Sequence, residues 1–141
     1  MATTAPQSAQ SETDPRVKAV FDDIQQTRGS DFINNFWRYL AFDPALLEET
    51  WRDVKAVMAT PSALDAKTKE MVYVAVSIAN ACSYCVHSHT ASARGQGMSD
   101  DEYADLMRVV STAARTNHLA NGLQIPVDAV FDVDRQEPPA G

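Results

Sequence analysis

Residues 70–89 read EMVYVAVSIANACSYCVHSH, and this stretch decides both the fold and the chemistry expected of the chain. It contains both cysteines, Cys82 and Cys85, and two of the three histidines. Because residues three and four apart share one face of a helix, we expect Cys82, Cys85 and His89 to form one stripe. Two cysteines at this spacing also lie within reach of each other for a disulfide. A thiol pair beside a base is the arrangement of a reversible redox site.

The apolar residues before the cysteines allow two secondary structures. Every second residue from 72 to 78 is Val or Ile, which favours a strand. Against a strand, residues 67–70 include good helix formers, and no turn residue separates them from the valines. A helix that is apolar on nearly all sides is expected to be buried. We therefore predict a central helix over about 65–80, with Ser62 or Asp65 as its cap.

Helix-start signals and apolar spacing extend the helical prediction to the rest of the chain. Asp14-Pro15 and Asp43-Pro44 each place a capping residue before a proline at the first helical position. Ser99 and Glu102 form a capping box. The predicted helices cover about residues 15–28, 30–41, 44–59, 65–80, 83–94 and 99–121. Since no convincing strand or internal repeat remains, we predict an all-α fold of about six helices.

The chain has 141 residues, enough for one domain with a buried core and no covalent staples. We expect this domain to span residues 14–131. Residues 1–13 are polar with little to bury, so a disordered tail is predicted there. Residues 132–141 are polar and proline-bearing, and they predict a loose tail.

Charge and hydropathy narrow the class of partner. The net charge is −7 and no lysine or arginine cluster is present, which argues against nucleic-acid or anionic membrane partners. The longest mainly apolar run, residues 71–79, is too short to span a bilayer. Residues 1–15 have neither a basic residue nor an apolar segment of the kind found in signal peptides, so we expect a cytoplasmic protein. In that reducing compartment, a Cys-x-x-Cys motif favours catalysis or metal binding over a permanent staple.

A zinc site built from Cys82, Cys85, His87 and His89 is the main alternative use of these residues. Structural zinc sites usually take two ligand pairs separated by a loop, whereas these four residues lie within eight positions. On a helix, His87 would face away from Cys85. We therefore predict no metal or other cofactor. A non-enzymatic zinc-binding or redox-sensing helical module stays as the alternative function. His87 is expected to be a partly exposed helix residue, and His118 is assigned no role.

The spacing of four residues carries a resemblance to a known family. Glu70 is followed by Cys82, Cys85 and His89 after twelve, three and four residues. This pattern resembles the Glu…Cys-x-x-Cys-x-x-x-His signature of alkylhydroperoxidase D-like proteins, within the carboxymuconolactone decarboxylase family. The match covers roughly residues 60–98, and Tyr84 stands where alkylhydroperoxidase D itself has a further histidine. The family's lactone decarboxylases lack the paired cysteines, so a decarboxylase is disfavoured. The resemblance implies an all-helical fold assembled as a homo-oligomer, a trimer or hexamer.

The residues alone leave open which thiol attacks. A helix N-terminus stabilises a thiolate and favours Cys82, whereas a base one turn away favours Cys85. The resemblance implies that Cys85 reacts with peroxide and Cys82 resolves it, with His89 and Glu70 as a proton relay. It also implies a hydroperoxide substrate and an external dithiol as reductant, either lipoyl-type or a small redox protein.

Glu70 can join this site only if the chain bends. On a straight helix Glu70 would point away from Cys82, so we predict a bend near Asn80-Ala81.

Overall fold

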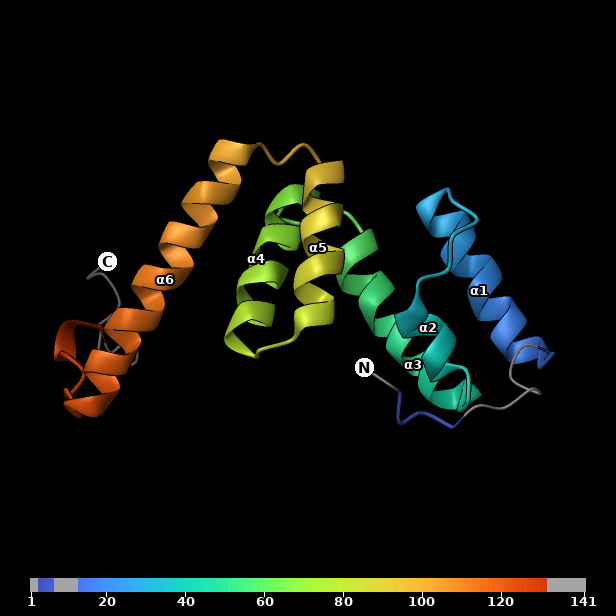
Figure 1. The fold of residues 1–141 in the computed structure, drawn as a ribbon, viewed down its shortest axis with the longest axis horizontal. Coiled ribbons are helices and arrows are strands. Elements are labelled where there is room, and N and C mark those ends of the chain that lie inside the picture. Colours follow the sequence, from blue (N-terminus) through green and yellow to red (C-terminus); the bar gives the residue numbers. More distant parts are fainter. Residues whose placement is uncertain (1–2, 7–12, 132–141) are drawn as a thin grey trace, which may run out of the picture. The chain divides into compact units, whose positions relative to one another are not determined.

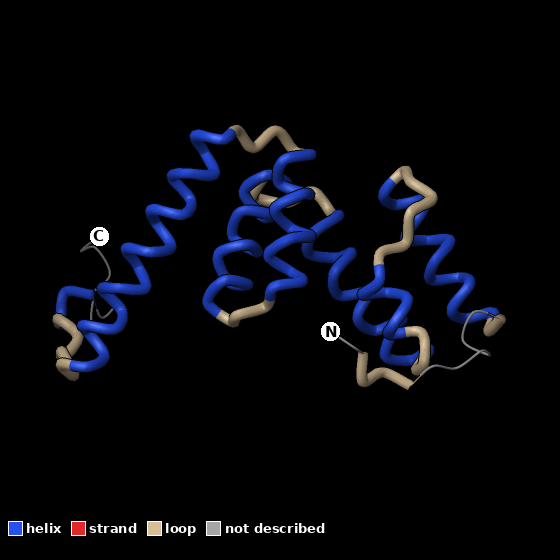
Figure 2. Tube along the Cα trace, in the orientation of Figure 1, coloured by secondary structure: helices blue, strands red, loops and turns tan. Residues whose placement is uncertain are grey.

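The computed structural model describes residues 3–6 and 13–131, and all regular structure in these residues is helical (Figures 1 and 2). The helices are α1 (Pro15–Arg28), α2 (Asn35–Leu40), α3 (Pro44–Val54), α4 (Ala66–Ala79), α5 (Ser83–Gly95) and α6 (Asp100–Gly122). A π-helical turn, η1 (Lys55–Ala59), follows α3, and a 3-10 turn, η2 (Ala129–Phe131), follows α6. The all-α prediction is confirmed. Most of the two predicted tails, 1–13 and 132–141, lies outside the described residues.

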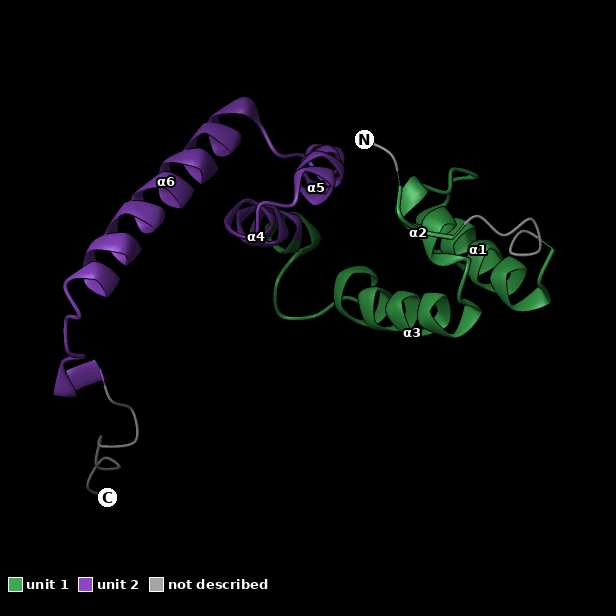
Figure 3. Ribbon diagram, turned by 60° about the horizontal axis from the view of Figure 1, so that its bottom comes forward, with its two compact units in different colours: residues 1–69 green, residues 70–141 purple. Residues whose placement is uncertain are grey.

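The chain divides into two compact units, residues 1–69 and 70–141 (Figure 3). The division falls inside α4, directly before Glu70. The single domain over 14–131 therefore stays a prediction. No helix in the described part of the chain is long and apolar enough to cross a membrane.

In the first unit, α1 begins and ends at the predicted residues. The Asp14 carboxylate accepts a hydrogen bond from the backbone N–H of Arg16 at 2.8 Å, and Gly29 ends the helix with a φ of 64°. The core packs Trp37 edge-on against Trp51, with ring centroids 5.3 Å apart. Its buried residues are Val17, Val20, Ile24, Ile33, Trp37, Ala41, Leu47 and Trp51.

The helix predicted over 30–41 is shorter than expected, because α2 begins only at Asn35. The preceding residues bond back to the end of α1. The Ser30 N–H donates to the Gln25 carbonyl at 3.2 Å, and the Gln25 side chain donates to the Asp31 carbonyl at 2.9 Å. Since these groups are engaged with α1, this part of the chain crosses to α2 in a non-helical conformation, and Phe32 is exposed.

The segment after α3 ends at Thr60 as predicted, but its last turn is the π-helical turn η1. The backbone carbonyl groups at the end of a helical segment have no hydrogen-bond donor within that segment, so they need donors from elsewhere in the chain. The Lys69 ammonium donates to the carbonyls of Val57 and Thr60 at 2.8 and 2.9 Å. These contacts hold the end of η1 against the start of α4.

The second unit has a smaller core, consisting of Val74, Ala93, Met98 and Leu106. The capping box of α6 is present, with Ser99 Oγ accepting from the Glu102 N–H at 3.0 Å and Glu102 Oε2 accepting from the Ser99 N–H at 2.9 Å. These contacts confirm the predicted start of α6.

The predicted central helix is present as α4, and Asp65 is the residue that caps it. Its side chain accepts from the Thr68 N–H at 2.8 Å. The expectation that α4 is buried on nearly all sides is wrong. Val74 is fully buried, but Val72 and Val76 are each about half exposed, at 51% and 52%. These two valines lie on a face of the helix that the core does not cover.

Candidate redox site

The bend predicted near Asn80-Ala81 is confirmed, and it turns α4 and α5 into a helical hairpin (Figures 1 and 3). Ala81 has a φ of 55°, in the left-handed region that residues with a side chain rarely adopt. The Cys82 N–H donates to the Ser77 carbonyl at 2.9 Å, which ties the start of α5 back to α4. Residues from the start of α4 in the second unit therefore come close to residues of α5.

Glu70 and His89 meet across this hairpin. Glu70 Oε2 lies 2.6 Å from His89 Nδ1, and the two side chains are only 15% and 21% exposed. Since a carboxylate can only accept, Nδ1 is the donor of this hydrogen bond, and in the neutral form of the ring Nε2 keeps its lone pair. The predicted partnership of these two residues is thus present as a short, mostly buried hydrogen bond.

Tyr73 is a third member of this group, and the motif spacing in the sequence does not predict it. Its ring stacks on the His89 imidazole, with centroids 3.6 Å apart and planes inclined by 19°. Tyr73 follows Glu70 by three residues, so both lie on one face of α4. That spacing was the signal that could have identified it.

The two cysteines lie at the first turn of α5, as predicted, and both are free thiols. Cys82 is the N-cap residue, and its Sγ accepts from the Cys85 N–H at 3.4 Å. Both side chains are partly buried.

The surroundings shift the pKa values of the two thiols in opposite directions. The side-chain hydrogen bond from Cys85, followed by the N–H groups of Cys85 and Tyr84, lowers the pKa of Cys82. Burial, followed by the bond to Cys82 and the charge on it, raises the pKa of Cys85 to about 11. The lower pKa of the pair therefore belongs to Cys82, as the helix-terminus argument predicts.

The predicted proton relay requires His89 to contact both Glu70 and Cys85. His89 bonds to Glu70, but no hydrogen bond joins His89 to either sulfur in this part of the chain. His87 and His118 are exposed. Within the described ranges, no three His, Cys, Asp or Glu side chains gather as a metal site would require. The roles of Cys85, Cys82, His89 and Glu70, and the expectation that no metal is bound, stay predictions.

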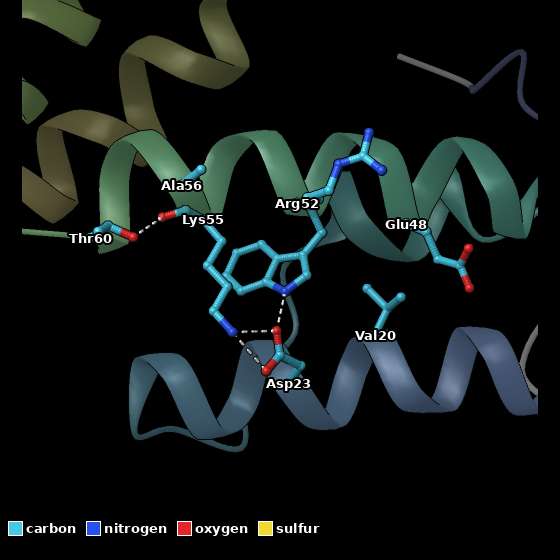
Figure 4. A pocket seen from close by; sticks show the side chains of 8 residues that line it. Val20, Asp23, Glu48, Arg52, Lys55, Ala56 and Thr60 are labelled. Carbon is cyan, nitrogen blue, oxygen red and sulfur yellow. Dashed lines mark hydrogen bonds and ion pairs between the residues drawn. The ribbon is translucent and has the colours of Figure 1, made fainter.

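A separate hollow of about 360 Å³ lies in the first unit and contains none of these residues (Figure 4). Its floor is an ion-paired cluster in which Asp23 accepts from Trp51 Nε1 at 2.6 Å and from Lys55 Nζ at 2.9 Å. The Trp51 bond, with help from Lys55, lowers the pKa of Asp23. Because these groups satisfy one another, we interpret the cluster as a link between α1 and α3.

The model of the carboxymuconolactone decarboxylase family matches residues 45–128, more than half of the chain. The chain belongs to this family. It is also similar to the solved structure of the alkylhydroperoxidase AhpD core from Rhodospirillum rubrum ATCC 11170, with 56% identity and a TM-score of 0.88. That alignment covers 95% of this chain and 99% of the other. Comparison with curated proteins gave no match. The resemblance seen in the sequence is confirmed, and this is an AhpD-like member of the family.

Proposed function

We propose that this protein is a thiol-dependent hydroperoxide reductase that works through a reversible Cys82–Cys85 disulfide. The observation that carries the proposal is the pair of adjoining thiols at the start of α5, with the Glu70–His89 hydrogen bond on the same hairpin. The similarity to an alkylhydroperoxidase core supports a role in peroxide chemistry. We propose that the protein acts in the cytoplasm, where a reducing environment regenerates the dithiol.

The reaction begins when Cys85 loses its proton. Because burial and Cys82 raise the pKa of Cys85 to about 11, this step needs a base. We assign this role to Nε2 of His89, which accepts the proton directly or through one water, while Glu70 stabilises the resulting imidazolium. The Cys85 thiolate then attacks the outer oxygen of the hydroperoxide, and the O–O bond breaks. The leaving oxygen takes the proton back from the His89 imidazolium, so the products are a sulfenic acid on Cys85 and an alcohol, or water when the substrate is hydrogen peroxide.

Cys82 completes the cycle. Its sulfur attacks the sulfenic sulfur of Cys85, a disulfide forms, and the oxygen leaves as water. The lowered pKa of Cys82 suits this role, because the thiolate is the nucleophile in sulfur exchange. An external dithiol, of lipoyl type or on a small redox protein, then reduces the disulfide and is itself oxidised.

The thiol count tests this function. One equivalent of hydroperoxide should consume both thiols of the reduced protein and join them within one chain, as read by mass spectrometry. Cys82→Ser should stop at a sulfenic acid on Cys85, and Cys85→Ser should abolish the reaction with peroxide. His89→Ala should slow peroxide turnover by about a hundredfold, the typical contribution of a general base. Thiols that survive peroxide would exclude the reductase.

Measurements on the same protein preparation distinguish the reductase from the non-enzymatic alternative, a zinc-binding or redox-sensing module. A zinc-binding module would carry about one zinc per chain, and Cys82→Ser would release it. A redox sensor would form the disulfide once but would not turn over with any dithiol reductant. Sustained peroxide consumption with a dithiol excludes both.

We also propose that the protein forms a homo-oligomer, a trimer or hexamer. Six large apolar side chains between residues 119 and 131 are more than half exposed, and a monomer would leave them in water. They are Leu119, Leu123, Ile125, Val127, Val130 and Phe131.

A further inference from the structure

We propose that Tyr73 is a positioning residue that fixes the plane of the His89 imidazole for the proposed reaction. The inference rests on the proposed function for its kinetic consequence, whereas the contact itself is a property of the fold. Tyr73 lies on α4 three residues after Glu70, and its ring faces the imidazole at a centroid distance of 3.6 Å.

The Glu70 hydrogen bond alone does not determine the orientation of His89. It fixes the direction of Nδ1 at 2.6 Å, but the χ2 torsion of histidine is soft, so the ring can still turn about that bond. The Tyr73 ring removes this freedom. At 3.6 Å and 19° the two rings are in face-to-face contact, so a large rotation of the imidazole would drive its edge into the phenol.

The position of Tyr73 is itself fixed. Its side chain is partly buried, and its backbone carbonyl accepts from Ser77 Oγ at 2.8 Å. The next residue, Val74, is fully buried in the core of the second unit. Burial, with smaller effects of Cys85, Cys82 and Glu70, raises the pKa of Tyr73, so its ring stays neutral throughout the working pH range. The same face of α4 therefore carries both Glu70, which bonds to Nδ1 of His89, and Tyr73, which fixes the plane of the His89 ring.

The ring face, rather than the hydroxyl, is the group that acts. Tyr73→Phe should therefore keep turnover near the wild-type value. Tyr73→Leu should lower it between about tenfold and about a hundredfold, the latter being the cost of a misplacement of about 1 Å. Tyr103→Leu is a matched control, because Tyr103 is a partly buried tyrosine of the same unit that contacts Arg94 rather than His89. It should leave turnover unchanged.

Nuclear magnetic resonance separates this inference from the proposed function. In the unmodified protein the His89 ring protons should show cross-peaks to the Tyr73 ring and an upfield ring-current shift, and ¹⁵N shifts should show the proton on Nδ1. Tyr73→Phe should keep the upfield shift, and Tyr73→Leu should lose it and broaden the tautomer signature. Missing cross-peaks in the unmodified protein, or a Tyr73→Leu spectrum with unchanged His89 signals, would overturn the inference even if peroxide turnover is present. If the spectra agree but no peroxide is consumed, only the proposed function fails.

Discussion

Two residues separate Cys82 from Cys85, yet the structure gives them opposite chemical tendencies. Cys82 caps α5 and receives hydrogen bonds from two backbone N–H groups and one thiol, all of which favour its thiolate. Cys85 lies one turn further along the helix, where burial favours its thiol. Cys82 therefore ionises before Cys85, and the thiol that keeps its proton to higher pH is the one proposed to attack. This arrangement explains why a nearby base is needed.

Measuring the alkylation of each thiol against pH tests which of the two has the lower pKa. Cys82 should react with iodoacetamide below the pH of 9.0 at which an ordinary thiol is half ionised, and Cys85 should react only as the pH approaches about 11. Limited labelling at neutral pH, followed by peptide mapping, should place the label on Cys82. Labelling of Cys85 first would contradict the order.

The control for this experiment follows from the cause of the shift. Cys85→Ala removes the side-chain donor that is the largest cause of the lowered pKa of Cys82, so its labelling curve should move to higher pH. Cys85→Ser keeps an O–H donor and should move the curve less.

The residues of the site could be predicted from the sequence to different extents. The Glu70–His89 contact follows from motif spacing plus a required bend, and the cysteines follow from their place at a helix start. Tyr73 was hidden because an aromatic residue within an apolar run is usually a core residue. Stacking depends on where α5 lies beside α4, and this information is not present in either segment alone.

At the scale of elements, the turn between α4 and α5 is the feature that assembles the site. It contains no glycine, and Ala81 adopts a φ of 55°. A residue with a Cβ in this region is strained by about 1 kcal/mol or more. The bond from the Cys82 N–H to the Ser77 carbonyl is one of the contacts that hold the turn in this shape.

Glycine substitutions at Ala81 and Ala79 test this strain, because only the change at Ala79 is expected to lower the free energy of unfolding. Ala81→Gly relieves it but makes the unfolded chain more flexible, so the free energy of unfolding should stay unchanged or rise by up to about 1 kcal/mol. Ala79→Gly, at the last helical residue of α4, should lower it by up to about 1 kcal/mol. Chemical denaturation followed by circular dichroism measures both. Equal losses in the two variants would show that Ala81 is not strained.

The ends of helices could be predicted where residues next to the helix end determine them. The prediction failed where contacts with distant residues determine the helix end. Asp14 and Ser99 cap their helices with their own side chains, so the sequence shows them. The start of α2 depends on bonds that Ser30 and Gln25 make around the end of α1, and apolar spacing continues through that segment regardless. The π turn η1 is supported by Lys69, twelve residues from Val57, and local periodicity cannot register such a contact.

At the scale of the whole molecule, the exposed apolar side chains between residues 119 and 131 lead us to expect a homo-oligomer. Light scattering after gel filtration should give the mass of a trimer or hexamer. Val127→Asp, at a side chain that is 81% exposed, should shift the mass towards the monomer, because a charge in an apolar interface is costly. Thr112→Asp, at an exposed neutral polar residue of α6, adds the same charge and serves as the control. A monomeric wild-type protein at micromolar concentration would contradict the proposal.

The α4–α5 hairpin also has a consequence for the order of events during biosynthesis. All five side chains proposed to act or to position a ring lie between residues 70 and 89. Contacts between residues close in sequence form early, since closing a short loop costs little entropy. We therefore expect the thiol pair to reach its final geometry while the chain is still being synthesised, once the hairpin and the start of α6 have left the ribosome. The nascent protein would then already be able to respond to oxidants before it meets another subunit.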